Sequence, residues 1–594
     1  MLALAALLAT RSAALQPSQK HVVVVGGGVG GLATASRLAK RGARVTILEK
    51  NDKVGGRVGE YRWQDHRWET GASLLLLPDV YRDALEAAGA AQLDVTRVSP
   101  AYGVWYEKHV DRGPVVLGAD RGELRRRLDL EAPGGFDRFE EYREAAREYL
   151  RAGWPIFIEE DIRPSSLAKL VPRFLATAAS ALWKWPLFGH DAQLRRLFPE
   201  SPRLRALCSF EDLYVGLSPV EAPAVFSLLA AIELDDASLN PDAGRADVGV
   251  FYPMGGFGQF PQLLADAAKA SGVEIRTSTA VEEVLVDEGR ATGVRTASGE
   301  RIDADAVVVN ADLAAAEPKL LGNNARSDYA NNRYSTSSIT FLWALDRRFD
   351  QLQHHNVFLS EDGDDDDPFL SAWDDQLPPR GASTAFPGNG FHFYMCANSR
   401  TDASSAPAGG DSLMVLCPTP PLPDDADDAL VDAWVEAARA EVFRRLEVSA
   451  GAAIEPHILH ERVIDPREWR GSLGLRRGSV FGLAHGLDQL AIFRPARQSS
   501  RVDGLSFVGA STRPGNGVPL VLTSARLLCD ELSEELGLKD SYYLERTTGR
   551  AAPRARASRT TRRRQATGWP QRITPLSSKL QPPPRRPKVR TGDR

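Results

Sequence analysis

Cysteine and methionine are both scarce in this chain, with four of each among 594 residues. The cysteines lie far apart and form no C-x-x-C pair, which argues against a disulfide framework and against a zinc ribbon. They are Cys208, Cys396, Cys417 and Cys529. The adjacent His354 and His355 have no third ligand at metal-binding spacing, and the acidic run at 361–367 lacks the alternating ligands of a calcium loop. We therefore predict no metal site.

Long hydrophobic runs are also missing from the sequence. Because no stretch of 18 consecutive apolar residues occurs, a conventional transmembrane helix is not expected. Hydrophobic residues nevertheless make up 43% of the chain and charged residues 25%, which excludes a disordered or fibrous protein. The length corresponds to about three domains at roughly 100 to 200 residues per domain.

Acidic residues are scarce in the C-terminal tail. Residues 546–594 contain fifteen Lys or Arg and a single acid, Asp593. The whole chain has 73 basic and 78 acidic residues, so removing the tail leaves 58 against 77 and a net charge near −19. A body this acidic argues against nucleic-acid binding. We expect a disordered tail at 546–594, either simply solvated or tethered to an anionic surface.

Residues 1–20 have the composition of a targeting presequence rather than of a folded element. A short apolar stretch precedes Arg11, and small residues before Pro17 form a possible cleavage site. This stretch resembles the boundary of bipartite plastid-targeting presequences, except that Leu15 stands where an aromatic residue is usual. We expect a membrane-associated plastid protein, with a secretory or endomembrane location as the alternative.

The motif that carries most information follows the presequence. A β-branched run at 21–25 leads directly into G-x-G-x-x-G at Gly26, Gly28 and Gly31, followed by a helical pattern at 32–41 and a second strand at 44–48. Gly26 permits the tight turn, Gly28 lets backbone N–H groups approach a pyrophosphate, and Gly31 lets the helix pack on the strand. Glu49 ends the second strand, where a carboxylate can accept ribose hydroxyls. Together with Gly30, these residues predict a dinucleotide site that disfavours a 2′-phosphate.

Two further segments favour FAD over NAD. Gly55, Gly56 and Arg57 follow Glu49 closely and offer a close approach to phosphates and a charge-assisted contact. This order resembles the extended FAD site of amine-oxidase-like flavoproteins. The segment at 68–73, with Gly71 and Ser73, resembles their next flavin-contacting turn, although Glu69 stands where Asp is usual.

A second strand–glycine turn–helix unit occurs near the C-terminus. A strand at 505–508 opens into a turn at 509–519, and a helical pattern follows at 520–535. We expect the turn to contact the cofactor, since the dipole of the helix can stabilise a reduced, anionic flavin. The predicted contacts are Gly509, Ser511, Gly517 and Val518. Further predicted strands lie at 273–277, 280–286, 292–296 and 306–310.

Residues 163–190 combine tryptophan, leucine and phenylalanine with lysine and arginine, and two prolines divide them. Such a composition suits a helix at a membrane surface, whereas a buried helical hairpin is the alternative interpretation. Residues 80–155 show a charged helical pattern typical of solvated helices.

With these motifs, the chain resembles the bacterial- and fungal-type phytoene desaturase family, which includes carotenoid isomerases. The resemblance runs from about residue 21 to residue 538. Its most specific segments are 213–224 (LYVGLSPVEAPA), 252–256 (YPMGG), 478–485 (GSVFGLAH), 493–495 (FRP) and 509–519 (GASTRPGNGVP).

The resemblance implies an α/β fold: a two-domain FAD-dependent oxidoreductase with a Rossmann-type dinucleotide-binding domain, a mixed-sheet substrate domain and a helical membrane-facing region. We expect the FAD-binding domain at 21–110, 250–320 and 500–540, the helical region at 111–249 and the substrate domain at 321–499. The backbone of Val281 should reach the adenine. The family implies a long carotenoid substrate, hydride transfer to flavin, and oxygen or a quinone as electron acceptor.

Two catalytic candidates remain, His485 and Arg513. Desaturases commonly carry His where this chain has Arg513, so that residue favours redox-neutral isomerisation over desaturation if it lies beside the flavin. A phosphate or surface contact is the alternative for Arg513, and a place in the core is the alternative for His485. Two other functions on this fold are an amine oxidase and a non-enzymatic prenyl-binding escort; the retained pyrophosphate glycines argue against the escort.

Overall fold

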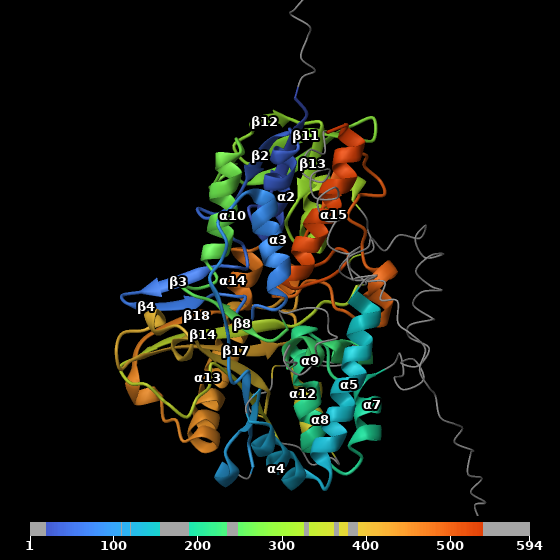
Figure 1. Cartoon of the computed structure of the whole chain (residues 1–594). Coiled ribbons are helices and arrows are strands. Elements are labelled where there is room, and N and C mark those ends of the chain that lie inside the picture. The colour runs from blue at the N-terminus through green and yellow to red at the C-terminus, as the bar shows by residue number, and fades with distance from the viewer. Residues whose placement is uncertain are drawn as a thin grey trace, which may run out of the picture. The chain divides into compact units, whose positions relative to one another are not determined.

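The computed structural model describes most of the chain between the presequence and the tail (Figure 1). The described ranges are 19–154, 189–234, 248–325, 332–361, 367–377 and 390–538, without His109 and Ala119 and with Tyr329 and Phe386. The basic tail, the segment at 163–188 and nearly all of the presequence lie outside them. Every helix within these ranges is too short or too polar to cross a bilayer.

A parallel sheet of five strands forms the first layer, in the order β19-β13-β1-β2-β9. The strands are β1 (His21–Val25), β2 (Arg44–Leu48), β9 (Glu274–Arg276), β13 (Ala306–Val309) and β19 (Leu505–Phe507). Because successive side chains of a strand point to opposite faces of the sheet, β1 contributes residues to two hydrophobic cores. Val22 and Val24 face the helices, and Val23 and Val25 face a three-stranded antiparallel sheet. The strands predicted at 21–25, 44–48, 306–310 and 505–508 are confirmed.

Helices cover one face of this sheet and a small sheet covers the other. The helices, which pack on one another (Figure 1), are α2 (Val29–Lys40), α3 (Pro78–Ala88), α10 (Gln259–Ala270) and α15 (Val518–Leu536). The small sheet comprises β10 (Val281–Asp287), β11 (Arg290–Thr296) and β12 (Arg301–Asp303). Each helix begins just after the strand or turn that precedes it, so α2 and α15 bring their N-termini to the same end of the sheet.

A mixed sheet of seven strands forms the second layer, in the order β18-β14-β17-β16-β15-β6-β7. Its strands are β6 (Tyr102–Tyr106), β7 (Val115–Leu117), β14 (Ser337–Leu345), β15 (His355–Leu359), β16 (Phe393–Ala397), β17 (Asp411–Thr419) and β18 (Ile458–Ile464). Neighbouring strands are antiparallel except β15 and β6, which are parallel. One face packs against α13 (Asp428–Ala450), and the other joins the core shared with the first layer.

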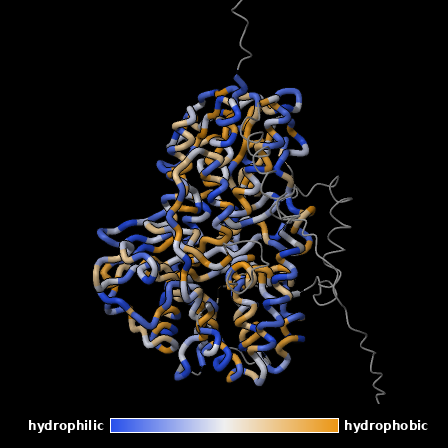
Figure 2. Tube along the Cα trace, viewed as in Figure 1, coloured by the Kyte–Doolittle hydropathy of each residue, from blue (hydrophilic) through white to orange (hydrophobic). Residues whose placement is uncertain are grey.

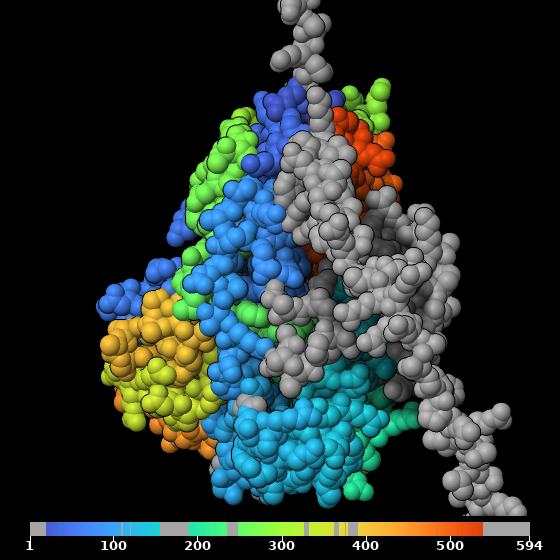
Figure 3. Space-filling model, viewed as in Figure 1, coloured from blue at the N-terminus to red at the C-terminus, as the bar shows by residue number. Residues whose placement is uncertain are grey.

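The position of β6 and β7 corrects the sequence interpretation. The boundary expected at residue 110 falls between these two strands, and the charged pattern at 80–155 predicts helices where they lie. Both strands instead extend the seven-stranded sheet, because β6 pairs with β15 some 250 residues later in the chain. In Figure 3 the chain between α3 and α4, in lighter blue, runs along one face from α10 (green) to α4 (cyan).

A helical layer follows β7. It contains α4 (Arg121–Glu131), α5 (Gly135–Trp154), α7 (His190–Leu197), α8 (Pro202–Ser209) and α9 (Leu228–Glu233), with two short 3-10 turns, η3 (Phe210–Tyr214) and η4 (Ala224–Ser227). Helix α5 packs on α4 and α9 and is amphipathic: Phe136, Phe139 and Tyr142 are buried while Glu141 and Glu144 are exposed. Figure 2 shows this alternation of hydropathy along the helix.

The remaining elements connect these layers. The helices are α11 (Leu313–Leu321), α12 (Pro368–Gln376) and α14 (Pro466–Gly471). Two strand pairs complete the list: β3 (Glu60–Trp63) with β4 (His66–Glu69), and β5 (Val95–Arg97) with β8 (Phe251–Pro253).

Candidate functional site

A cavity of about 610 Å³ lies where the two layers meet. Its polar end is formed at the carboxyl ends of four parallel strands, by Gly26 after β1, Glu49 after β2, Asn310 after β13 and Gly509 after β19. Ligands of open α/β sheets bind at this edge, because the loops and helix N-termini that contact them leave the strands there. The cavity is therefore where the sequence predicts a dinucleotide.

The turn between β1 and α2 is packed so closely that it requires glycine. Gly26 has a φ of +103°, and a Cβ built there would lie 2.4 Å from the backbone oxygen of Asn310. Gly28, which precedes the first residue of α2, lines the cavity together with Gly30. Gly31 does not line the cavity; a Cβ there would lie 2.2 Å from the Gly26 oxygen. Its function is the close packing of helix on strand, as predicted for this position.

Glu49 is buried at the end of β2, and the backbone holds its carboxylate in place. One oxygen accepts a hydrogen bond from the N–H of Gly27 at 2.7 Å, and the other accepts one from the N–H of Asn51 at 2.9 Å. Each carboxylate oxygen has a second lone pair, which leaves acceptor capacity for ribose hydroxyls. Val281 also lines the cavity.

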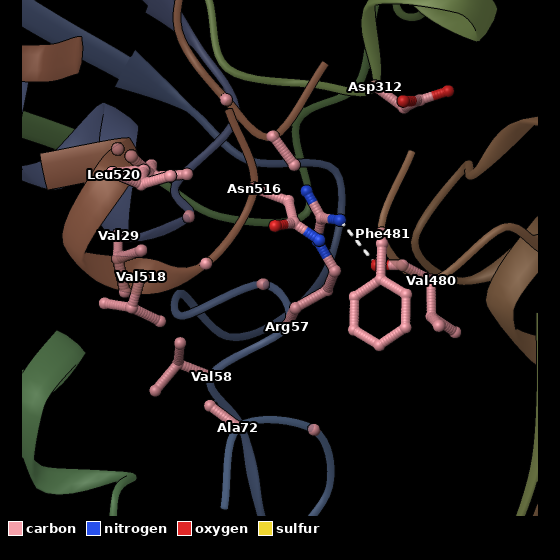
Figure 4. Close-up of a pocket in the computed structure, with 18 of the residues that line it drawn as sticks. Val29, Arg57, Val58, Ala72, Asp312, Val480, Phe481, Asn516, Val518 and Leu520 are labelled. Atoms are coloured by element: carbon pink, nitrogen blue, oxygen red, sulfur yellow. Dashed lines mark hydrogen bonds between the residues drawn. The ribbon is translucent and has the colours of Figure 1, made fainter. Parts of the chain in front are cut away.

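The second glycine segment docks on the first. The N–H of Gly55 donates to the oxygen of Gly27 at 2.9 Å, and a Cβ on Gly56 would lie 3.3 Å from Cα of Gly28. Arg57 follows, and its Nη1 donates to the carbonyl of Val480 at 2.7 Å (Figure 4). Burial lowers the pKa of this guanidinium, and the charge of Asp312 opposes that shift. Arginine nevertheless keeps its positive charge inside a protein. It is placed to bind an anionic group in the cavity.

The turn predicted at 68–73 contributes Gly71 and Ser73 to the lining, whereas Glu69 does not reach the cavity. A Cβ on Gly71 would lie 2.1 Å from the backbone oxygen of Arg57, so this turn clamps the arginine loop. Glu69 is buried and accepts a hydrogen bond from the Tyr252 hydroxyl at 2.7 Å, and burial raises its pKa. Its role is to join this turn to β8.

The C-terminal turn completes the polar end. Gly509, Gly517 and Val518 line the cavity, and α15 begins at Val518. Ser511 does not line it: its hydroxyl donates to Asp312 Oδ1 at 3.0 Å and accepts the Leu483 N–H at 3.2 Å. Ser511 therefore fixes one loop against another rather than facing a cofactor.

Asn310 and Asp312 are site residues that sequence reasoning missed. Asn310 directly follows β13, and its Nδ2 donates to the Val508 carbonyl at 2.7 Å, which ties two strand ends together. Its Oδ1 is buried without a partner among the described residues and faces the position of a Gly28 Cβ, 2.8 Å away. The signal in the sequence that could have identified Asn310 is a polar residue at the end of an apolar strand.

The groups around the polar end of the cavity fit FAD. They are the glycine turn, the N-termini of α2 and α15, the guanidinium of Arg57 and the carboxylate of Glu49.

The two catalytic candidates lie in different places. His485 lines the cavity, and its Nε2 accepts a hydrogen bond from the N–H of Asn516 at 3.3 Å. Burial, and then Arg494, hold its pKa well below the ordinary range, so the ring is neutral. Arg513, for which a place beside the flavin and a phosphate or surface contact were the two alternatives, is not among the lining residues. Its N–H donates to the Pro495 carbonyl at 3.0 Å, and Pro514 and Asn516 line the cavity instead.

The other end of the cavity is apolar. Its lining residues from α5, η4, α9 and the turn before α3 are mostly leucine and other large hydrophobic side chains: Leu74, Leu76, Leu77, Leu150, Trp154, Val225, Phe226, Leu228, Leu229 and Ile232. Two tyrosines, Tyr214 and Tyr394, also line the cavity. This arrangement suits a long hydrocarbon that reaches toward a flavin.

The structure brings Cys396 close to His354 and His355, a grouping that the spacing of these residues in the sequence does not indicate. Strand β16 places Cys396 opposite His355, and ligand atoms of the three buried side chains lie within 4.8 Å of one another. Nδ1 of His354 is 2.6 Å from the Thr401 hydroxyl, and Nδ1 of His355 is 2.7 Å from that of Tyr394. Burial lowers the pKa of both histidines and raises that of the thiol.

Comparison with known proteins agrees with this site. Residues 29–533 match the family described as flavin containing amine oxidoreductase. A zeta-carotene-forming phytoene desaturase of Myxococcus xanthus is 35% identical over 519 residues, which cover 86% of this chain and 94% of the relative. A phytoene desaturase of Neurospora crassa is 32% identical over 537 residues, covering 87% and 85%.

A solved structure supports the fold. Cyclohexylamine oxidase from Brevibacterium oxydans aligns with a TM-score of 0.56 at 14% identity, covering 87% of this chain and 100% of that one. Since the family match spans most of the chain, and the cradle fits the cofactor, the prediction of FAD is confirmed. The chain belongs to the flavin-containing amine oxidoreductase family, and within it to the phytoene desaturase group, as an FAD-dependent oxidoreductase.

Proposed function

We propose that this enzyme desaturates a long carotenoid polyene in carotenoid biosynthesis. The observation that carries the proposal is a single cavity whose polar end has the FAD cradle and whose other end is lined by leucine, phenylalanine and tryptophan. Relatives named as phytoene and zeta-carotene desaturases support the substrate class. The flavin, when bound, supplies a hydride acceptor, and the walls of the cavity exclude water from the reacting carbons.

The position of Arg513 bears on the choice between desaturation and isomerisation. The argument for redox-neutral chemistry needed its positive charge beside the flavin, and its side chain does not line the cavity. Without that charge, desaturation is the simpler function for this site. We propose oxygen or a quinone as the electron acceptor, and a plastid membrane surface as the location, on the strength of the presequence and the segment at 163–190.

Expression in bacteria that accumulate phytoene tests the substrate. We expect phytoene to be converted into coloured, more conjugated products, because the apolar end of the cavity offers a hydrocarbon surface next to the flavin site. Pigment chromatography provides the measurement, and the same bacteria expressing Gly28→Val provide the control. Unchanged phytoene together with isomerisation of supplied poly-cis lycopene would assign the enzyme to redox-neutral chemistry instead.

Membrane attachment has a separate test. The segment at 167–188 lies outside the described residues, so the proposal rests on its tryptophans and phenylalanines. Replacing Trp183, Trp185 and Phe188 by serine should release the protein from liposomes in a flotation assay while the flavin absorbance of the protein stays unchanged. Flotation equal to that of the wild type would place these side chains in the protein core.

A further inference from the structure

A buried carboxyl group is connected to the cavity by two tyrosines. Glu233 ends α9 and is 1% exposed, and Tyr102 on β6 is 0% exposed. The Tyr102 hydroxyl donates to Oε2 of Glu233 at 2.6 Å, and the Tyr102 and Tyr214 hydroxyl oxygens are 3.4 Å apart. Tyr214 lines the cavity. Hydrogen bonds therefore connect the cavity wall to Glu233.

The direction of these hydrogen bonds follows from donor counting. A phenol has one O–H, and that of Tyr102 is used on Glu233. The bond between the two phenols must then be donated by Tyr214, which leaves lone pairs on the Tyr214 oxygen for a proton from the cavity. The Tyr214 backbone carbonyl accepts from Nδ2 of Asn516 at 3.1 Å, so the residue is fixed beside the C-terminal turn.

Among the residues that the structure describes, few charged groups near Glu233 could neutralise it. Groups on neighbouring elements that face it are Tyr142 on α5, Glu211 and Tyr214 on η3, and Tyr102 on β6. Asp212 is paired with His190 at 2.9 Å, and Arg143 is bonded to Glu140 and to the Leu234 carbonyl. Oε1 of Glu233 and Oε2 of Glu211 are buried and have no hydrogen-bond partner among the described residues.

This environment sets the protonation state of the pair. Burial raises the pKa of Glu233 to about 8, and burial together with the charge of Glu233 raises that of Glu211 well above its ordinary value. Glu233 therefore exchanges a proton near neutral pH, as a catalytic acid or base requires. Glu233 does not itself line the cavity, and the two described acids that do are engaged: Glu49 by two backbone N–H groups, and Asp312 by Ser511 and the Arg476 N–H.

We propose that Glu233 is the proton acceptor of the reaction, reached from the substrate through Tyr214 and Tyr102. The inference rests on the proposed function. A desaturation removes a hydride from one carbon and a proton from its neighbour, and the two electrons of the second C–H bond form the new double bond. The proton binds the Tyr214 oxygen, the Tyr214 proton moves to Tyr102, and the Tyr102 proton moves to ionised Glu233.

Anaerobic single-turnover kinetics with phytoene in liposomes tests the relay. Flavin bleaching by the wild type should become about tenfold faster per pH unit below pH 8 and level off above it, because ionised Glu233 is the active form. Glu233→Gln and Tyr102→Phe should each slow bleaching about 100-fold and remove this pH dependence. Tyr106→Phe is the matched control, since its buried hydroxyl, on the same strand, donates to the Arg203 carbonyl away from the cavity.

Infrared spectroscopy of the FAD-loaded protein without substrate gives an independent measure. The band of a protonated carboxyl group should disappear with a midpoint near pH 8 in the wild type, and this change should be missing from Glu233→Gln. Wild-type bleaching rates in a folded, FAD-bound Glu233→Gln would overturn the relay alone. A wild type that no carotenoid reduces would overturn the proposed function and the relay with it. If Glu233→Gln does not fold, Tyr102→Phe with unaltered kinetics would also refute the relay.

Discussion

Replacing Gly28 by valine should yield a folded protein that does not bind FAD. Gly28 has a φ of −70° and ψ of 173°, which valine adopts readily, so the backbone can keep its path. The new Cβ would nevertheless lie 2.8 Å from Oδ1 of Asn310, so the valine side chain would crowd the part of the cavity wall that Gly28 and Asn310 form. We expect FAD affinity to fall at least about 1000-fold, or about 4 kcal/mol.

Flavin absorbance after gel filtration in excess FAD measures this loss, and thermal unfolding of the apo forms shows whether the fold is kept. Gly471→Val is the matched control, because a Cβ there meets nothing within 4 Å and Gly471 does not line the cavity. A yellow Gly28→Val protein with a wild-type FAD content would show that the pyrophosphate does not bind at this turn.

Replacing Arg494 by methionine should destabilise the protein by about 3–5 kcal/mol and also weaken FAD binding. Arg494 is 1% exposed and donates to four backbone carbonyls, those of Leu483, Ala484, Gln489 and Ala510, at 2.6 to 3.3 Å. Burial lowers its pKa to about 9, so it remains charged at neutral pH. Methionine fills similar space but leaves these carbonyls without their donor.

These carbonyls belong to the two loops that carry His485 and the C-terminal glycine turn, which explains the expected effect on the cofactor. Urea unfolding measures the stability, and Arg501→Met is the control, since this exposed arginine bonds one carbonyl at the surface. An unfolding free energy within about 0.5 kcal/mol of the wild type would mean that water replaces the guanidinium.

Local patterns in the sequence were sufficient for the dinucleotide half of the site. Strand, glycine turn, helix and acid follow one another within 30 residues, and each residue has a function that depends on its chain neighbours. Gly26, Gly28, Glu49 and Arg57 therefore lie where the spacing placed them. The complete burial of β1 follows in the same way from its run of four successive valines.

Tertiary structure decided what depends on pairing between distant segments. Strands β6 and β7, within residues 102–117, belong to the seven-stranded sheet because β6 pairs with β15. The same pairing places Tyr102 between Glu233 and the cavity. Cys396 lies opposite His355 only because of the register between β15 and β16. Arg513 and Ser511 do not line the cavity, because the conformation of the C-terminal turn determines which of its residues face inward. Strand partners and turn orientation result from packing of the whole core, which no local spacing encodes.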